Sequence, residues 1–329
     1  MTRAVGILGI GHYVPEKILT NFDLEKMVET SDEWITERTG IKQRHIAAPE
    51  EATSDLAYNA AVAALKDAGV DAGEIDLVIV ATASPDHPFP SVACMVQDRI
   101  GAVKAAAFDL AAGCSGFVYS LAVASQMIKS GLYNKALIIG AETLSRIMNW
   151  QDRNTCVLFG DGAGAAVVGL VDDGYGVLGI DLGSDGSGMP YLFQPAGGSR
   201  NPASEATVAA NDHTIHMNGP EVFKFAIKIL GKTALRALVK ANMEPSELNM
   251  LFPHQANLRI ITSAAKRLKM PMEKVWVNVD KYANTSAASI PIALCEAQSA
   301  GALKKGDNIM LCGFGAGLTW AAIVLKWSK

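Results

Sequence analysis

The sequence has few cysteines, and their spacing is not that of a crosslinked or metal-binding protein. Their number is odd and no two form a Cys-x-x-Cys pattern, so the sequence predicts neither a disulfide framework nor a zinc site. Such usage is typical of a reducing compartment, and we expect a cytoplasmic protein. The cysteines are Cys94, Cys114, Cys156, Cys295 and Cys312.

Long apolar runs and blocks of like charge are also missing. No apolar stretch is long enough to cross a bilayer, and the run after Arg3 is too short for the apolar core of a signal peptide. The formal net charge is −4, with 29 Lys and Arg against 33 Asp and Glu. We therefore expect neither a membrane nor nucleic acid as a partner.

Hydrophobic residues are abundant, by contrast, and the chain repeats itself. Its 329 residues are 50% hydrophobic and 19% charged, which is enough for a large buried core. Four features recur in one order at offsets of 170 (176 minus 6) or 173 (240 minus 67) residues. The pairs are 6–10 with 176–180, 67–80 with 240–253, the turn at Cys114 with that at Asn284, and 136–140 with 308–313.

The repeat predicts an α/β fold made of two copies of one half, residues 1–174 and 175–329. Apolar strands alternate with helices in each copy, which indicates β-α-β units whose sheets are covered on both faces. Residues 183–211 fall outside the repeat. Their Gly, Ser, Pro and Ala content predicts a long irregular loop, either a lid or binding loop or a disordered linker.

The segment around Cys114 has the pattern of a nucleophile on a strand-to-helix turn. An apolar strand ends at Leu110, a short turn follows, and a buried helix of small residues begins at Cys114. The free N–H groups and the dipole at a helix N-terminus favour a thiolate, so we expect a lowered pKa for this thiol. The alternative is a small buried hydrophobe, which is what most free cysteines are.

The repeat brings two further polar residues to the same end of the sheets. Asn284 follows an expected strand at 275–279 and is equivalent to Cys114, whereas His254 follows an expected strand at 249–252. Because α/β folds bind ligands at the carboxyl ends of strands, we expect these three side chains to share one site. A plain helix N-cap for Asn284 and a structural role for His254 are the alternatives.

Six motifs combine in one chain: 30–34 (TSDEW), 38–41 (RTGI), 112–116 (AGCSG), 253–257 (PHQAN), 284–289 (NTSAAS) and 313–317 (GFGAG). Together they resemble β-ketoacyl-acyl-carrier-protein synthase III, a family of thiolase-fold condensing enzymes, over essentially the whole chain. The resemblance implies a thiolase-like fold in which each half has a mixed sheet with helices and the halves are stacked in layers.

The resemblance also implies a decarboxylative condensation. The Cys114 thiolate attacks an acyl-CoA primer, short-chain such as acetyl-CoA, while backbone N–H groups of Cys114 and Ala316 hold the oxyanion. Malonyl-acyl-carrier protein then loses CO2, and His254 and Asn284 donate hydrogen bonds to the enolate oxygen. The 3-oxoacyl-acyl-carrier protein formed initiates fatty acid synthesis. Acyl-CoA is a substrate, and no metal or redox cofactor is implied.

Substrate-binding residues are implied in the same way. Trp34 and Arg153 match positions that sandwich the CoA adenine, and we expect Arg38 and Asn257 to bind CoA as well. An ordinary, partly buried tryptophan is the alternative for Trp34. Phe89 matches a residue that reaches into the neighbouring subunit's acyl pocket in homodimeric relatives, so we expect a homodimer.

A basic patch predicts docking of the acyl-carrier protein. On an expected helix at 256–269, Arg259 and Lys266 are seven residues apart and share one face. With Lys224 and Arg267 they form a patch that would attract an acidic carrier protein to an acidic enzyme. A solvated helix face is the alternative reading of these charges.

Three positions depart from the pattern of the family. Ala283 stands where Gly is usual, so a positive φ there would strain the backbone by about 1 kcal/mol or more. Pro220 stands where Asn is frequent, which removes a polar contact near the pantetheine arm. Ala316 replaces a common Gly, but the oxyanion needs only its N–H group.

Other functions stay open at this point. A related condensing enzyme of secondary metabolism would differ in primer and pathway alone. A Cys-His-Asn thioester hydrolase would use the same residue types, although the local signatures of papain-like enzymes are absent. An NAD-dependent oxidoreductase is suggested only by loose glycine patterns. A carrier-binding protein without activity would not need all three chemical residues.

Overall fold

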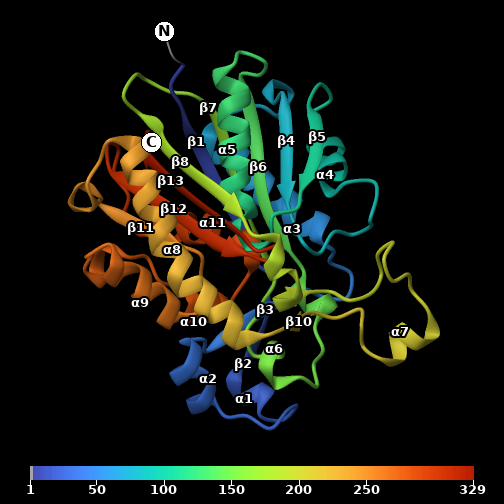
Figure 1. Ribbon diagram of the computed structural model, residues 1–329. Helices are drawn as coiled ribbons and strands as arrows, with labels where there is room; N and C mark the ends of the chain where they lie inside the picture. Colours follow the sequence, from blue (N-terminus) through green and yellow to red (C-terminus); the bar gives the residue numbers. More distant parts are fainter. Residues whose placement is uncertain (1–2) are drawn as a thin grey trace.

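The computed structural model describes residues 3–329 and contains two large mixed sheets (Figure 1). The first sheet has the strand order β1-β7-β6-β4-β5. Strand β4 runs parallel to both β5 and β6, whereas β7 is antiparallel to β6 and β1. The strands are β1 (Val5–Tyr13), β4 (Leu77–Ala81), β5 (Ala106–Leu110), β6 (Lys135–Glu142) and β7 (Gly162–Leu170).

The second sheet repeats this arrangement with one strand fewer. Its order β8-β13-β12-β11 matches β1-β7-β6-β4 strand for strand, including the parallel pair at its end. The strands are β8 (Gly176–Ser184), β11 (Met250–Pro253), β12 (Asn308–Gly315) and β13 (Thr319–Lys326). The duplicated α/β fold is therefore confirmed. The division at residue 174, between β7 and β8, stays a prediction.

The strand expected at 275–279 is wrong. Only an isolated bridge joins Leu251 to Val275, and helix α10 (Val279–Tyr282) begins where the strand was expected to end. The Gln255 side chain explains the difference, because it donates to the carbonyl of Trp276 and accepts from the N–H of Asn278. These backbone groups are satisfied by a side chain, so this segment does not need a partner strand.

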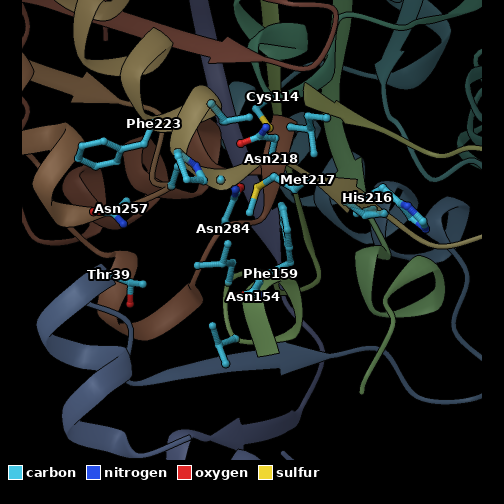
Figure 2. A pocket seen from close by; sticks show the side chains of 18 of the residues that line it. Thr39, Cys114, Asn154, Phe159, His216, Met217, Asn218, Phe223, Asn257 and Asn284 are labelled. Carbon is cyan, nitrogen blue, oxygen red and sulfur yellow. The ribbon is translucent and has the colours of Figure 1, made fainter. Parts of the chain in front are cut away.

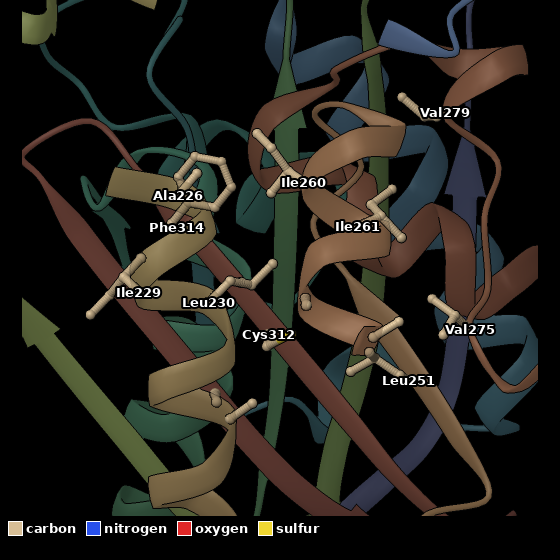
Figure 3. Packing of buried hydrophobic residues seen from close by; sticks show 14 of the residues in the cluster. Ala226, Ile229, Leu230, Leu251, Ile260, Ile261, Val275, Val279, Cys312 and Phe314 are labelled. Carbon is tan, nitrogen blue, oxygen red and sulfur yellow. The ribbon is translucent and has the colours of Figure 1, made fainter. Parts of the chain in front are cut away.

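Helices separate and cover the two sheets, giving five layers. The outer face of the first sheet packs against α3 and α4, the two sheets enclose α5 and α11, and α8 and α9 cover the second sheet (Figure 3). The helices are α3 (Thr53–Ala68), α4 (Val92–Ile100), α5 (Gly116–Lys129), α8 (Gly219–Ala241), α9 (Leu258–Arg267) and α11 (Ser289–Ser299). The layered arrangement expected from the resemblance is confirmed.

Equivalent residues end equivalent helices in the two halves. The C-cap residue of α3 is Gly69, with φ +62°, and that of α8 is Asn242, with φ +53°. Gly and Asn are the residues that adopt this left-handed cap most readily. Small residues also let α3 approach the sheet, since a Cβ at Gly11 of β1 would lie 2.2 Å from the backbone nitrogen of Ala64.

The segment 183–211 is more ordered than the expected irregular loop. The Asp185 side chain accepts from the N–H of Ser187 and caps a 3-10 turn, and Ser204 caps helix α7 (Glu205–Ala209) through the N–H of Thr207. Strand β9 (Leu192–Phe193) pairs with β10 (His216–Met217). Short polar side chains thus replace periodicity as the source of local structure.

The shorter elements complete the chain. Strands β2 (Lys17–Thr20) and β3 (Gln43–Ile46) pair near α1 (Asn21–Leu24) and α2 (Asp32–Thr39), and α6 (Arg153–Cys156) lies close to β10 (Figure 1). Within residues 3–329, no helix combines the length and the apolar character needed to cross a bilayer.

Candidate active site

Turns from both halves meet at one cavity of about 980 Å³. Its lining includes Cys114, His254 and Asn284, so the structure brings the three expected side chains together. Figure 2 draws Cys114 and Asn284 among the cavity side chains, with Phe223 and Asn257 also labelled. A cavity of this volume is large enough for a small-molecule ligand.

Cys114 is held by very close contact between the two halves. It lies in a 3-10 turn (Gly113–Ser115) that leads into α5. A Cβ at Gly113 would lie 2.8 Å from the nitrogen of Ala316, and one at Gly315 would lie 2.3 Å from the nitrogen of Cys114. Only glycines permit this approach, which places the Ala316 turn against the Cys114 backbone.

The expected lowering of the Cys114 pKa is wrong for the free protein. Burial raises the pKa of this thiol to about 12, a contact with Ser286 opposes the shift, and the nearby Glu142 adds to it. The side chain is 8% exposed and precedes the first helical residue of α5 by two positions. Desolvation of the thiolate therefore outweighs the helix terminus, and the thiol is neutral at neutral pH.

His254 follows β11 and is held from several sides. The backbone N–H of His254 donates to the carbonyl of Cys312 at 2.8 Å. The imidazole packs edge-to-face with the Phe314 ring, with the ring centroids 5.5 Å apart. The ring Nδ1 lies 2.7 Å from Ser289 Oγ, whereas Nε2 is buried and has no hydrogen-bond partner among residues 3–329. Burial lowers the His254 pKa to about 3, so the imidazole is neutral at neutral pH.

Asn284 reaches the cavity from a different element than expected, because it follows α10 and not a strand. Its backbone N–H donates to Leu158 O and its carbonyl accepts from Gly160 N, at 2.9 and 3.1 Å. Its side-chain Oδ1 accepts from the N–H of Ser286 at 2.9 Å. The N-cap of the following 3-10 turn (Ser286–Ala288) is Thr285, so the plain N-cap alternative for Asn284 is wrong. The Oδ1 contact leaves the Nδ2 group as the available donor.

Trp34 and Arg38 line the cavity, and Arg153, which does not line it, also lies against the Trp34 ring. The guanidinium carbon of Arg38 is 4.7 Å from the Trp34 ring centroid, and that of Arg153 is 5.3 Å away. Arg153 also donates to the carbonyl of Glu29 at 2.8 Å. The roles of all three residues in binding CoA stay predictions.

Of the other residues considered for substrate contacts, Asn257 and Pro220 line the cavity and Phe89 does not. Asn257 lines the cavity, but its side chain caps α9 through the N–H of Arg259 and donates to the carbonyl of Arg38. Pro220 lines the cavity in the first turn of α8, where a missing N–H costs no helical hydrogen bond. Phe89 is 85% exposed and does not line the cavity of its own chain.

The basic face (Lys224, Arg259, Lys266 and Arg267) is exposed on α8 and α9. Helix α9 is shorter than the expected 256–269. The guanidinium carbon of Arg259 lies 5.4 Å from the ring of Phe223, which lines the cavity. Arg267 lies across Gly231 of α8, and Lys224 is 3.8 Å from Glu221. Arg259 therefore lies beside the cavity, whereas Glu221 reduces the charge around Lys224.

Three residues that shape the site were missed in the sequence. Ser289 contacts His254, Phe314 packs against its ring, and Gln255 joins the His254 loop to 276–278. The first two are separated from His254 by 35 and 60 residues (289 minus 254 and 314 minus 254). The motifs contained all three residues, but no sequence spacing shows which side chains meet.

Comparison with known proteins identifies the class. The solved 3-oxoacyl-(acyl carrier protein) synthase III from Pseudomonas aeruginosa aligns with a TM-score of 0.92 at 42% identity, covering 99% of each chain. The synthase III structure from Aquifex aeolicus aligns with a TM-score of 0.91 at 47% identity, covering 98% of this chain and 100% of the other. The fold is that of the thiolase-fold condensing enzymes.

Sequence comparison then gives the family. Models of 3-oxoacyl-[acyl-carrier-protein] synthase III match residues 108–186 and, for its C-terminal part, 238–327. The beta-ketoacyl-[acyl-carrier-protein] synthase III of Caldanaerobacter subterraneus is 61% identical over 99% of this chain and 98% of its own. That of Clostridioides difficile is 56% identical over the full length of both. The chain belongs to the 3-oxoacyl-acyl-carrier-protein synthase III family.

Proposed function

We propose that this chain condenses an acyl-CoA primer with malonyl-acyl-carrier protein to give 3-oxoacyl-acyl-carrier protein, CoA and CO2, the step that initiates fatty acid synthesis. The observation that carries this proposal is one cavity in which a nucleophilic thiol meets two neutral hydrogen-bond donors, His254 and Asn284. Family membership supports the same reaction class.

The first half-reaction loads Cys114. Its sulfur attacks the thioester carbonyl carbon, and we expect the backbone N–H groups of Cys114 and Ala316 to stabilise the tetrahedral oxyanion. The close approach of the Ala316 turn to the Cys114 backbone supports this role. The carbon–sulfur bond to CoA then breaks. Because the Cys114 pKa is raised, the reacting species starts as a thiol, and its proton ends on the departing CoA thiol. Acyl-Cys114 and free CoA are the products.

The second half-reaction makes the carbon–carbon bond. Malonyl-carrier protein loses CO2, and the electron pair of the broken carbon–carbon bond forms a thioester enolate. The enolate oxygen needs hydrogen-bond donors. His254 Nε2–H and Asn284 Nδ2–H supply these without adding negative charge. The enolate carbon attacks acyl-Cys114, the carbon–sulfur bond breaks, and the released thiolate takes a proton from solvent. This sequence calls on no redox or metal chemistry, so we infer that no cofactor is needed.

Product analysis tests the proposal and its alternatives together. Purified protein would be incubated with malonyl-carrier protein and a panel of acyl-CoAs, and the products identified by mass. We expect 3-oxoacyl-carrier protein, formed best from a short primer such as acetyl-CoA. A thioester hydrolase would instead release free acid without the malonyl donor.

A role in secondary metabolism is the second candidate within the family. A solved priming β-ketosynthase of the R1128 polyketide pathway aligns with a TM-score of 0.91 at 34% identity. Preference for a long or unusual primer in the same panel would favour this role. The higher identity to the synthase III enzymes favours primary metabolism.

We also infer a homodimer. Strand β5 is the edge of the first sheet and pairs only with β4 among the described residues, and none of its residues is buried. An unpaired edge of this kind is a template for pairing with a second copy. The exposed Phe89 lies on the loop between β4 and α4, so a second copy at this side could receive it. Light scattering of the purified chain tests this state.

We propose that the basic face receives the acidic carrier protein. It borders the cavity through Arg259 and Phe223, so a carrier bound there could deliver its pantetheine arm to Cys114. Lys304 and Lys305 are also exposed, but they lie before the first residue of β12, at the opposite end of that strand from the cavity, and serve as the control pair for charge reversal. The five free cysteines fit a reducing cytosol, where we expect these partners to meet.

A further inference from the structure

Ser289 is the first residue of α11 and its hydroxyl is buried beside the His254 ring. The side chain is 2% exposed, its Oγ lies 2.7 Å from His254 Nδ1, and the N–H of Gln255 donates to it at 3.3 Å. No other hydrogen bond of Ser289 Oγ is present within residues 3–329. The hydroxyl therefore joins the His254 ring to the backbone of the same loop.

Counting protons decides the direction of these bonds. The backbone N–H of Gln255 can only donate, so Ser289 Oγ accepts that bond. If Ser289 also accepted from His254 Nδ1, its own proton would be buried without an acceptor, which is unfavourable. Ser289 therefore donates to Nδ1. A neutral imidazole whose Nδ1 accepts carries its proton on Nε2, the nitrogen without a hydrogen-bond partner in the described chain, residues 3–329.

We propose that Ser289 is a positioning residue that fixes the tautomer of His254, holding the proton on Nε2 where it can donate to the enolate oxygen. The inference rests on the proposed function for its consequence, but the tautomer itself is a property of the free protein. The opposite tautomer would present a lone pair of Nε2 to the developing negative charge. That state would oppose decarboxylation and leave the attack of Cys114 on acyl-CoA unaffected.

The rigid surroundings of the ring support the assignment. Phe314 packs edge-on against the imidazole, and the buried Gln255 side chain fixes the loop through Pro253 O, Trp276 O and Asn278 N. The ring therefore cannot turn to exchange its two nitrogens without breaking these contacts. Among the described residues, the Ser289 hydroxyl is the hydrogen-bond partner of Nδ1, so it decides the tautomer.

Nitrogen NMR of protein labelled with 15N-histidine tests the proposal directly. The His254 signals are identified by their loss in His254→Asn. In the parent we expect a protonated Nε2 and an unprotonated Nδ1. Ser289→Ala should populate the other tautomer, and Ser289→Thr, which keeps the hydroxyl, should restore the parent pattern. Ser125→Ala is the control, since it removes a buried hydroxyl that donates to Ala122 O within α5.

The half-reactions give a second readout. Ser289→Ala should slow decarboxylation of malonyl-carrier protein by about tenfold or more, because the wrong tautomer at a catalytic histidine is costly, while acylation of Cys114 stays near the parent rate. If Ser289→Thr does not fold, Ser289→Cys keeps a weaker donor and should give an intermediate tautomer ratio.

Several results would overturn the proposal. A proton on Nδ1 in the parent would do so, as would a His254 tautomer that Ser289→Ala leaves unchanged, whatever the rates. An equal loss of both half-reactions would indicate a structural role. Failure of the parent to decarboxylate malonyl-carrier protein would refute the proposed function instead, and the NMR result would still decide the tautomer.

Discussion

Ala283 carries a backbone conformation that an alanine tolerates poorly. Its φ is +55° and its ψ is −155°, a region occupied almost only by glycine, and the residue is fully buried next to Asn284. A residue held in such a region costs about 1–3 kcal/mol. The sequence predicts strain if Ala283 has a positive φ. The structure has that φ, and Ala283→Gly should relieve the strain.

The net effect follows from three contributions. The substitution relieves about 1–3 kcal/mol of strain. It loses about 0.8 kcal/mol for one buried methyl group and about 0.4–1 kcal/mol through the greater freedom of glycine in the unfolded chain. The free energy of unfolding should therefore change by between about −0.8 and about +1.8 kcal/mol. The Ala283 N–H bond to Val279 O survives the substitution, because it uses only the backbone.

A matched variant isolates the strain. Ala322 is also fully buried, but it lies in β13 and is not among the residues with positive φ. Ala322→Gly should therefore lose the methyl and entropy contributions without any relief. Urea unfolding at one protein concentration should show Ala283→Gly more stable than Ala322→Gly by about 1–3 kcal/mol. Equal destabilisation of the two variants would refute the strain.

Three further outcomes follow from the same structure. Because the Cys114 pKa is about 12, the thiolate fraction rises about tenfold per pH unit up to pH 10, and alkylation by iodoacetamide should quicken in proportion. The rate is measured from the masses of the peptides, and a plateau below pH 9 would contradict this. The His254 pKa is lowered to about 3 in the folded protein, so between pH 7 and pH 5 the histidine takes up a proton only in the unfolded chain. The free energy of unfolding of the parent should therefore fall by about 2 kcal/mol from pH 7 to pH 5. His254→Asn should lack this loss in urea titrations; an identical loss would refute it. Reversing Arg259 and Lys266 to Glu should raise KM for malonyl-carrier protein, less so at high salt, and spare acylation by acyl-CoA, because exposed charges mainly steer association. Reversing the control pair, Lys304 and Lys305, should change neither this KM nor the acylation rate. An equal rise in KM for both double variants would refute docking at the basic face.

The duplicated fold could be predicted from the sequence because the repeat consists of apolar strands and helix-capping residues. Gly69 and Asn242, 173 positions apart (242 minus 69), cap equivalent helices. The strand at 275–279 failed because a single distant side chain, Gln255, satisfies its backbone groups. Apolar content alone cannot separate such a segment from a strand, since both bury the same residues.

The candidate site was predicted in its members but not in its electrostatics. Motifs placed Cys114, His254 and Asn284 in one cavity, as the structure does. The direction of the Cys114 pKa depends on burial, which a local helix-terminus argument does not include. The partner of His254 Nδ1 depends on the contact between two loops, so Ser289 could be recognised only in three dimensions.

The central claim is that acyl-Cys114 is the intermediate of a condensation. Its most direct test is to load the protein with labelled acetyl-CoA, add malonyl-carrier protein, and follow peptide and carrier masses in time. The account predicts one acetyl group on Cys114 that persists until the malonyl donor is added and then moves to the carrier as a 3-oxoacyl group. Label on another cysteine, or its release as free acetate before the donor is added, would contradict the account.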